Sequence, residues 1–317
     1  MKKAAWASFW ILGFIWGSSF LLIRIGVEDV PATQLVLVRT VIAAIGLNLV
    51  RMARGIPLPR DWPTVRALIL IGIGNVTIPY TLISFAEQEI SSGMAAVLQA
   101  TASLFTLVIA HFFLSDERMS VQKIIGLTVG FGGVIVLSSQ SISGGEIDTR
   151  MLLGQMGMVA ASFFYAMFIT YSRIVIKRDI APIVIASANF IPAAIASAVL
   201  VVLEPLFGGR AFVPFTDLPS GALWAIFGLG FLNTFIAYMF FYFIVQQLGA
   251  VRGSMVTYVV PLVGLFLGWL VLQEELTPQM LIGAALIFTG IGTVNLRMPP
   301  RQKPLPVEAT SAPTSGD

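Results

Sequence analysis

The polar stretch Ser115-Asp116-Glu117-Arg118-Met119-Ser120-Val121-Gln122 has a second copy, Gln273-Glu274-Glu275-Leu276-Thr277-Pro278-Gln279. Four residues recur 157 positions later: Glu117, Gln122, Gly126 and Gly133 return as Glu274, Gln279, Gly283 and Gly290. Each copy is a charged turn between two apolar segments long enough to cross a bilayer. If an odd number of crossings separates the two turns, they face opposite sides of the membrane. Such an inverted repeat is the plan of many secondary transporters.

The composition is that of a membrane protein. Of 317 residues, 57% are hydrophobic and 11% are charged, and the mean hydropathy is +0.89. A soluble domain carries about a quarter charged residues. The absence of cysteine and the single histidine, His111, argue against metal sites of the usual kinds. No phosphate-binding glycine loop is present, so we expect no cofactor, no metal and no ATP-driven step.

Ten apolar stretches reach the length of about 20 residues that a spanning helix needs. They are approximately 4–25, 32–53, 65–86, 92–114, 121–139, 151–175, 181–203, 220–245, 250–272 and 278–296. Because these stretches are continuous and not alternating, a β-barrel is excluded. The predicted fold class is an all-α polytopic membrane protein with ten transmembrane helices, arranged as two inverted five-helix repeats.

The predicted domains follow from this count. The first repeat covers 1–140 with spans 1–5, and the second, inverted repeat covers 150–296 with spans 6–10. Trp16 aligns with Tyr165 at an offset of 149, which supports the front of the repeat. The segment 297–317 is rich in Pro, Ser and Thr and predicts a disordered cytoplasmic tail.

The positions of the basic residues predict orientation. The net charge is +3, and most of the 19 Lys and Arg residues fall in loops on the side that holds the N-terminus. Basic loops of membrane proteins are cytoplasmic, so we expect both termini in the cytoplasm and a multi-pass protein of the cell (inner) membrane. The same placement indicates a lipid bilayer as partner and no nucleic acid.

Several motifs together resemble the EamA-type family of the drug/metabolite transporter superfamily. In both halves a glutamate-containing turn is followed by Gln-x-x-x-Gly at the start of the last span. Trp16-Gly17-Ser18-Ser19-Phe20, Leu37-Val38-Arg39 and Pro261 are also similar to the family pattern. The resemblance implies a carrier of small metabolites, often an exporter of amino acids, with a cavity lined by spans 1, 3, 4, 6, 8 and 9. Leu104 departs from the pattern, because it stands where Pro261 stands in the second half.

Polar groups at mid-membrane are the candidates for substrate contact, because they cost free energy unless they face water or each other. The predicted substrate-binding residues are Trp16, Asn75, Tyr80, Ser84, Gln99, Ser103, Tyr165, Asn233, Tyr238, Thr257 and Tyr258. Amide, hydroxyl and aromatic groups suit a neutral or zwitterionic small molecule. The alternative is that these groups hydrogen-bond between helices. Acidic residues lie in loops, at span ends or in the tail, with Glu87 and Glu204 nearest to burial, so the predicted cavity contains no carboxylate.

Three further positions are candidates for gating. Arg39 lies well inside span 2 and could hold a substrate carboxylate, or could instead reach the interface or neighbouring carbonyl groups. Pro79 and Pro261 each remove a helix hydrogen bond and predict helix bends. Glycines in spans 5 and 10 predict close helix packing, so the chain is a monomer or a homodimer through those spans.

The leading functional prediction is a secondary-active or facilitative transporter, and not an enzyme. It would export small metabolites such as amino acids by alternating access around an uncharged polar cavity. Other solutes, namely nucleobases, sugars or drugs, stay open. A lipid-modifying intramembrane enzyme is the alternative, although the spans contain no evident catalytic set. An oligomeric channel is the third candidate.

Overall fold

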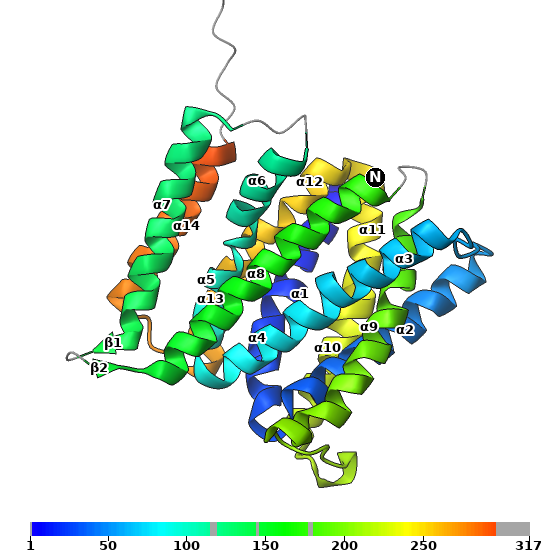
Figure 1. The fold of residues 1–317 in the computed structure, drawn as a ribbon, viewed down its shortest axis with the longest axis horizontal. Coiled ribbons are helices and arrows are strands. Elements are labelled where there is room, and N and C mark those ends of the chain that lie inside the picture. Colours follow the sequence, from blue (N-terminus) through cyan, green and yellow to red (C-terminus); the bar gives the residue numbers. More distant parts are fainter. Residues whose placement is uncertain (1, 115–118, 144–145, 177–179, 296–317) are drawn as a thin grey trace, which may run out of the picture.

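The computed structural model describes residues 2–114, 119–143, 146–176 and 180–295. Consecutive helices run back and forth to form one bundle (Figure 1). The first half consists of α1 Lys2–Asp29, α2 Ala32–Ala53, α3 Trp62–Gly72, the π-helix η1 Ile73–Thr77, α4 Ile78–Glu89, α5 Ser92–Gln99, α6 Ala102–Phe113 and α7 Val121–Ser138. The second half consists of α8 Thr149–Val175, α9 Pro182–Leu203, α10 Ser220–Gly230, the π-helix η5 Phe231–Ile236, α11 Ala237–Leu248, α12 Ala250–Ser254, α13 Val256–Leu272 and α14 Pro278–Asn295.

The helices are long and apolar enough for a multi-pass membrane protein. Nine helical segments of the described residues meet the length and hydropathy needed to cross a bilayer, and a shorter apolar helix covers 278–294. The predicted spans therefore correspond to helices, although the tenth is shorter than expected within the described part. The first copy of the polar turn at 115–118, the basic residues Lys177 and Arg178, and the predicted tail 297–317 lie outside the described residues.

Short elements connect the helices. Between the halves, η2 Ser139–Ser141 leads into a small hairpin, in which β1 Ile142–Ser143 pairs antiparallel with β2 Glu146–Ile147. The 3-10 turns η3 Glu204–Phe207 and η4 Phe215–Asp217 lie in the connection between α9 and α10. The hairpin lies between the two halves of the chain.

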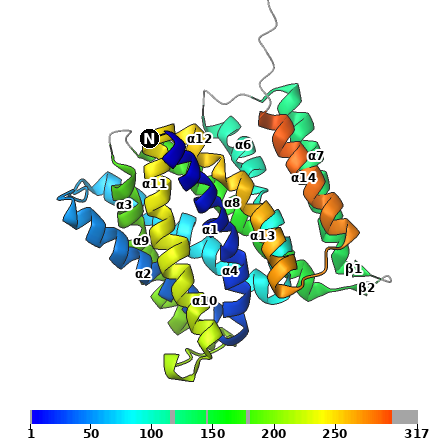
Figure 2. The ribbon, with the colours of Figure 1, turned by 180° about the vertical axis from the view of Figure 1, so that it is seen from behind.

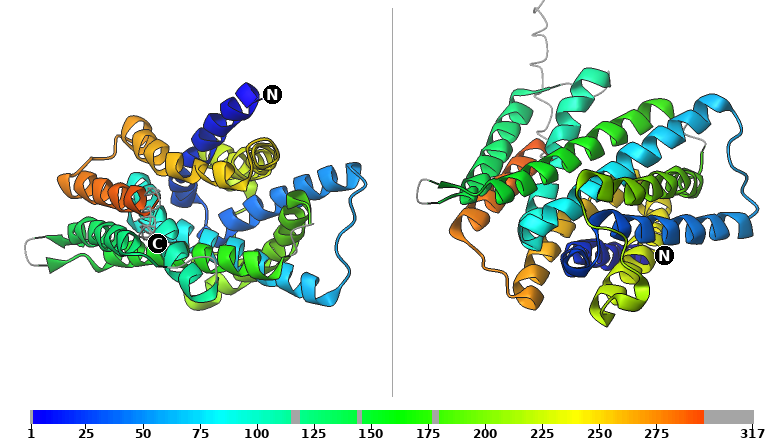
Figure 3. Two further views of the ribbon diagram at one scale, coloured as in Figure 1. Left: turned by 90° about the horizontal axis from the view of Figure 1, so that it is seen from above. Right: turned by 60° about the horizontal axis from the view of Figure 1, so that its bottom comes forward.

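Helix packing follows a two-fold pattern. α1 packs against α10, α11 and α13, and its counterpart α8 packs against α4, α5 and α6. α2 packs against α9, which occupies the same place in the second half, and both views of Figure 3 show these two helices on the same side of the bundle. Each of the helices α1 and α8 therefore packs against the equivalent helices of the opposite half.

The last helices of the two halves, α7 and α14, lie side by side at one edge of the molecule (Figures 1 and 2). Glycines make the close approach possible. A methyl group at Gly133 would lie 2.7 Å from the carbonyl oxygen of Gly283, and one at Gly283 would lie 2.9 Å from that of Gly133. Close packing at these glycines is thus seen within one chain. A homodimer through spans 5 and 10 would have to use their outward faces, where Ile124 is half exposed.

Two spans are interrupted, and neither break needs a proline. Span 4 breaks between α5 and α6, where the amide groups of Ala100 and Thr101 bond three residues back. Span 9 breaks at Met255, between α12 and α13, whereas Pro261 lies inside α13. Pro79 follows η1 at the start of α4, where the wider π turn accommodates the missing hydrogen-bond donor.

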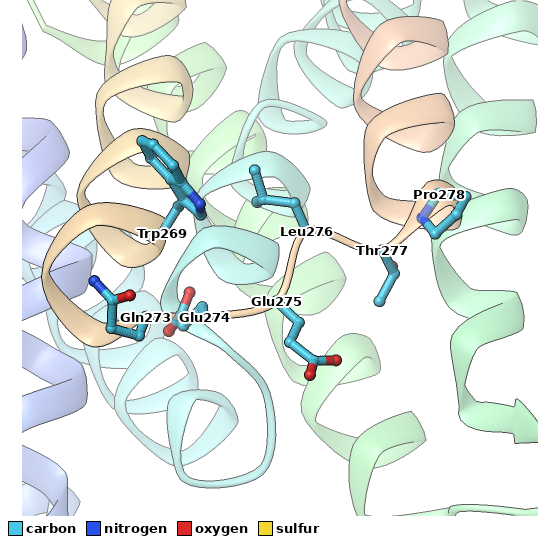
Figure 4. Close-up of a pocket in the computed structure, with 7 residues that line it drawn as sticks. All are labelled: Trp269, Gln273, Glu274, Glu275, Leu276, Thr277 and Pro278. Carbon is cyan, nitrogen blue, oxygen red and sulfur yellow. The ribbon is translucent and has the colours of Figure 1, made fainter.

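The second copy of the polar turn anchors span 4. Gln273 has a left-handed backbone with φ of 55°, and Glu274 then reaches the N-terminus of α5. Its carboxylate accepts hydrogen bonds from the backbone amides of Ser92 at 2.7 Å and Gly93 at 2.9 Å. Glu275 points away from this helix end (Figure 4). A carboxylate at a helix N-terminus satisfies unpaired amides and the helix dipole, so Glu274 has a structural role.

Glu274→Ala is therefore expected to lower the free energy of unfolding by about 2 kcal/mol, because two buried amides lose a charged acceptor. Thermal melting in detergent measures the effect. Glu275→Ala is the matched control, since the neighbouring side chain is exposed, and it is expected to change stability by less than about 0.5 kcal/mol. Equal effects of the two changes would contradict the anchoring role.

Candidate functional site

Arg39 of α2 is a charged side chain in the bundle interior and is only 6% exposed. Its Nε donates to Thr234 Oγ1 of η5 at 2.8 Å, and its guanidinium lies 3.9 Å from the ring centroid of Tyr80. Within the described residues, no carboxylate pairs with Arg39, and its two terminal nitrogens make no hydrogen bond to protein. A buried guanidinium with free donors can bind a carboxylate in two-pronged fashion.

Aromatic side chains from both halves surround Arg39. Tyr80, Tyr165 of α8 and Tyr238 lie close enough to one another and to Arg39 to influence each other electrostatically. The ring of Tyr238 meets Trp16 edge to face, with centroids 6.3 Å apart. We call Arg39, Tyr80, Tyr165 and Tyr238 the arginine–tyrosine cluster. The cluster brings together four of the residues that the sequence singled out, with Trp16 at its border.

Other predicted residues carry buried polar atoms without partners. Asn75 Oδ1, Ser84 Oγ and Gln99 Oε1 have no hydrogen-bond partner within the described part of the chain. Buried polar atoms in proteins are almost always satisfied by protein or by water. Unpaired acceptors in an apolar bundle therefore mark places where water or a polar ligand can bind.

The two asparagines of the π-helices have different surroundings. Asn233 donates through Nδ2 to the Ile15 carbonyl, to Ser18 Oγ at 2.9 Å and to Ser19 Oγ at 3.2 Å, all on α1. Asn75 stands 158 positions earlier, as Gly72 and Tyr80 stand before Gly230 and Tyr238. This match is a sequence signal of the repeat that the motif reading missed.

The difference between the asparagines has a simple cause. At the offset that aligns Trp16 with Tyr165, Met167 and Phe168 of α8 stand where α1 has its two serines. Because neither side chain offers a hydroxyl, the amide of Asn75 has no counterpart of those bonds. Asn233 therefore joins two helices, whereas Asn75 Oδ1 is left without a partner.

Three other predicted residues and His111 have different surroundings. Thr257 is exposed, and its hydroxyl donates to the Ser254 carbonyl at 2.8 Å. Tyr258 and Ser103 are half-buried on α13 and α6. His111 accepts a hydrogen bond from the Met119 amide at 3.1 Å, as an interfacial structural histidine would.

Two residues near the cluster, Thr234 and Glu87, were not among the predicted site residues. Thr234 fixes the direction of Arg39, as described above. Glu87 of α4 is completely buried, and neither of its carboxylate oxygens has a partner. Its spacing from Tyr80 and Ser84 places all three on one helix face, and this spacing could have indicated its burial.

Hydrogen bonds join the two halves at the end of the bundle that holds the turn between α1 and α2. Glu204 accepts from the hydroxyl of Thr33, and Gln34 exchanges two hydrogen bonds of 2.8 Å with the backbone of Val213. The Glu274 anchor on α5 lies at the same end of α13 and α4. This end of the bundle is therefore bridged by contacts between the halves.

Two pockets on the surface lie away from the cluster. One, of about 500 Å³, is lined by Trp269 and the turn 273–278 (Figure 4), and the other, of about 540 Å³, lies between apolar residues of α3 and α9. Within the described residues, no group of three or more His, Cys, Asp or Glu side chains could hold a metal ion. The cluster is thus the strongest candidate site for a small polar ligand.

Comparison with known proteins gives a consistent picture. The chain matches the EamA-like transporter family twice, over residues 5–139 and 152–296. It is 27% identical to the "Probable amino-acid metabolite efflux pump" of Escherichia coli (strain K12), over 87% of this chain and 90% of that protein. It is 30% identical to the "Uncharacterized inner membrane transporter YedA" of the same organism, over 81% and 79%. A solved crystal structure, 19% identical, superposes with a TM-score of 0.62 over 92% of this chain and 97% of that one, which shows a shared fold.

Proposed function

Because this multi-pass membrane protein belongs to the EamA-like transporter family, we propose that it exports small metabolites bearing a carboxylate, such as amino acids. The single observation that carries the substrate class is the buried guanidinium of Arg39, which has free donors and no partner carboxylate. The name of the Escherichia coli relative, "Probable amino-acid metabolite efflux pump", supports the same class.

In the proposed binding mode, the carboxylate of the substrate bonds the terminal nitrogens of Arg39 beside the ring of Tyr80. Asn75 and Gln99 offer unpaired acceptors that suit an ammonium group. The rings of Trp16 and Tyr238 give an apolar surface for the substrate side chain. These groups discriminate by hydrogen bonding and shape, so a neutral amino acid is the best match.

The transport cycle that we propose is alternating access between two inverted repeats, 1–140 and 150–296. The two-fold packing of corresponding helices and the family match to both halves support it. The basic loops favour cytoplasmic termini, so the end closed by Glu204 and Gln34 would be the external one. Opening would exchange the contacts at that end for contacts at the other.

Counterflow tests this function. Purified protein in liposomes preloaded with unlabelled L-phenylalanine is expected to accelerate entry of the labelled amino acid, and a panel of neutral amino acids defines the range. A channel gives no such acceleration, and an enzyme that modifies lipid moves no solute. Absence of counterflow for the whole panel would overturn the proposed substrate class.

Variants of Asn75 and Asn233 distinguish a role in substrate binding from a role in stability. We expect Asn75→Ala to lower counterflow by about 3- to 10-fold, the value of one hydrogen bond, with an unchanged melting temperature. Asn233→Ala, the matched variant in the other half, is expected to lower stability by about 1–2 kcal/mol, because it removes bonds to α1. A lower melting temperature together with parental counterflow for Asn75→Ala would show that the two roles are wrongly assigned.

A further inference from the structure

Glu87 is an acidic side chain that the proposed binding mode does not use. It lies two residues before the end of α4, is 0% exposed, and leaves both carboxylate oxygens without a hydrogen-bond donor. An ionised carboxylate held in this way is strongly disfavoured, whereas a protonated carboxyl group is tolerated. Buried ionisable residues inside membrane helices commonly serve ion or proton pathways.

The nearest charged groups do not satisfy this carboxyl group. Arg24 of α1 donates to the backbone carbonyls of Glu87 at 2.5 Å and Gln88 at 3.4 Å, and not to the carboxylate. Glu274 acts on Glu87 electrostatically, but its own carboxylate is bound to the N-terminus of α5. Glu87 is therefore the acidic group at this place that is free to gain and lose a proton.

The other elements packed against this part of α4 contribute little charge. α2 contributes Arg39, which also acts on Glu87 electrostatically. α5 contains no charged residue, and α8 presents Gly154 and Gly157 to the backbone of α4. Besides its burial, the charged groups that act on Glu87 are thus Glu274, Arg24 and Arg39.

A polar face of α4 connects Glu87 to the arginine–tyrosine cluster. Tyr80, Ser84 and Glu87 follow each other at spacings of four and three residues, so they lie on one side of the helix. Ser84 is 1% exposed, and its hydroxyl has no partner. A hydroxyl group in this position can relay a hydrogen bond or hold a water molecule between the two sites.

We propose that Glu87 is the proton-binding site of this carrier and couples proton movement to transport. This inference rests on the proposed transport function. With α4 buried as described, the carboxyl group holds the proton. When the closed end opens and water reaches Glu87, the O–H bond breaks, the proton passes to water, and the carboxylate is stabilised by the guanidinium groups of Arg24 and Arg39.

Arg39 links the proton site to the substrate site. A substrate carboxylate on Arg39 offsets the positive charge that favours ionised Glu87. By reciprocity, the protonation state of Glu87 then changes the affinity for that carboxylate. Proton and substrate are thereby linked through one buried guanidinium.

The test uses the full chain in liposomes with L-phenylalanine, or the panel amino acid that exchanges fastest. For one proton per substrate, each unit of pH difference across the membrane is expected to change steady-state accumulation about tenfold in the parent. Glu87→Gln, which mimics the protonated form, is expected to abolish this response and to keep counterflow at equal pH. Glu89→Gln is the matched control, because Glu89 ends the same helix and is exposed; its pH response should equal that of the parent.

The outcomes distinguish the two proposals. No counterflow in the parent defeats the transport function itself. Normal counterflow together with a Glu87→Gln variant that still responds to the pH difference as the parent does would overturn the proton site alone. If Glu87→Gln fails to insert or exchange, the parent protein is tested in liposomes that contain a trapped pH dye. A change of lumenal pH upon L-phenylalanine entry supports the proposal, and no change refutes it.

Discussion

Replacing Arg39 by glutamine is expected to lower L-phenylalanine counterflow by about 100-fold, the largest loss that we foresee from one substitution. The estimate corresponds to about 3 kcal/mol, which lies within the range measured when one partner of a buried charge pair is removed. The physical reason is that Arg39 is the buried cation of the cluster, with its terminal nitrogens free. Glutamine cannot replace a charged, two-pronged donor.

Controls separate binding from folding. Arg66→Gln removes an exposed arginine on α3 and is expected to leave counterflow unchanged. Arg39→Lys keeps the charge but loses the planar contact with Tyr80, so an intermediate rate is expected. In the parent, phenethylamine, which lacks the carboxylate, should fail to compete with L-phenylalanine. Effective competition by the amine, or normal counterflow by Arg39→Gln, would remove Arg39 from the binding site.

Gly290→Ala is expected to destabilise the protein by about 3 kcal/mol, the upper end of overpacking costs. The added methyl group would lie 2.5 Å from the carbonyl oxygen of Gly126 and 2.6 Å from the amide nitrogen of Gly130. Both are backbone atoms of α7, so a change of rotamer cannot relieve the clash. The melting temperature in detergent should fall by roughly 6–12 °C.

Gly292→Ala is the matched control for this prediction. Gly292 lies on the same helix two positions later, and a methyl group there would meet no atom within 4 Å. Alanine favours a helix over glycine, so this variant should melt at the parent temperature or slightly above. Equal melting temperatures of the two variants would show that the packing of α7 against α14 does not require close backbone contact at Gly290.

Much of the fold could be predicted because membrane helices leave strong signals. Length and hydropathy located the spans, and the positions of Gly133 and Gly283 predicted a close contact that the structure places between α7 and α14. The breaks were less visible. Span 4 bends near Gln99 although Leu104 replaces the expected proline, because a local turn suffices where packing supports it.

The sequence predicted the types of residue in the candidate site better than their positions in space. Tyr80, Tyr165 and Tyr238 stood out as polar groups in apolar segments, and the structure brings them together around Arg39. Thr257 fitted the same criterion but faces outward, because residue type alone does not reveal which helix face is buried. Glu87 was valued too little, since its place near a span end suggested hydration, whereas packing against α1 and α8 removes it from water.

The pairing of α7 with α14 has a consequence for biosynthesis. α7 is complete before half of the chain has left the ribosome, yet the glycine surface that receives its partner stays uncovered until the final helix is inserted. Nascent chains thus pass through a stage in which this groove is open to lipid or to insertion factors. A chain cut short before Pro278 would therefore leave the first half with the packing surface of α7 uncovered.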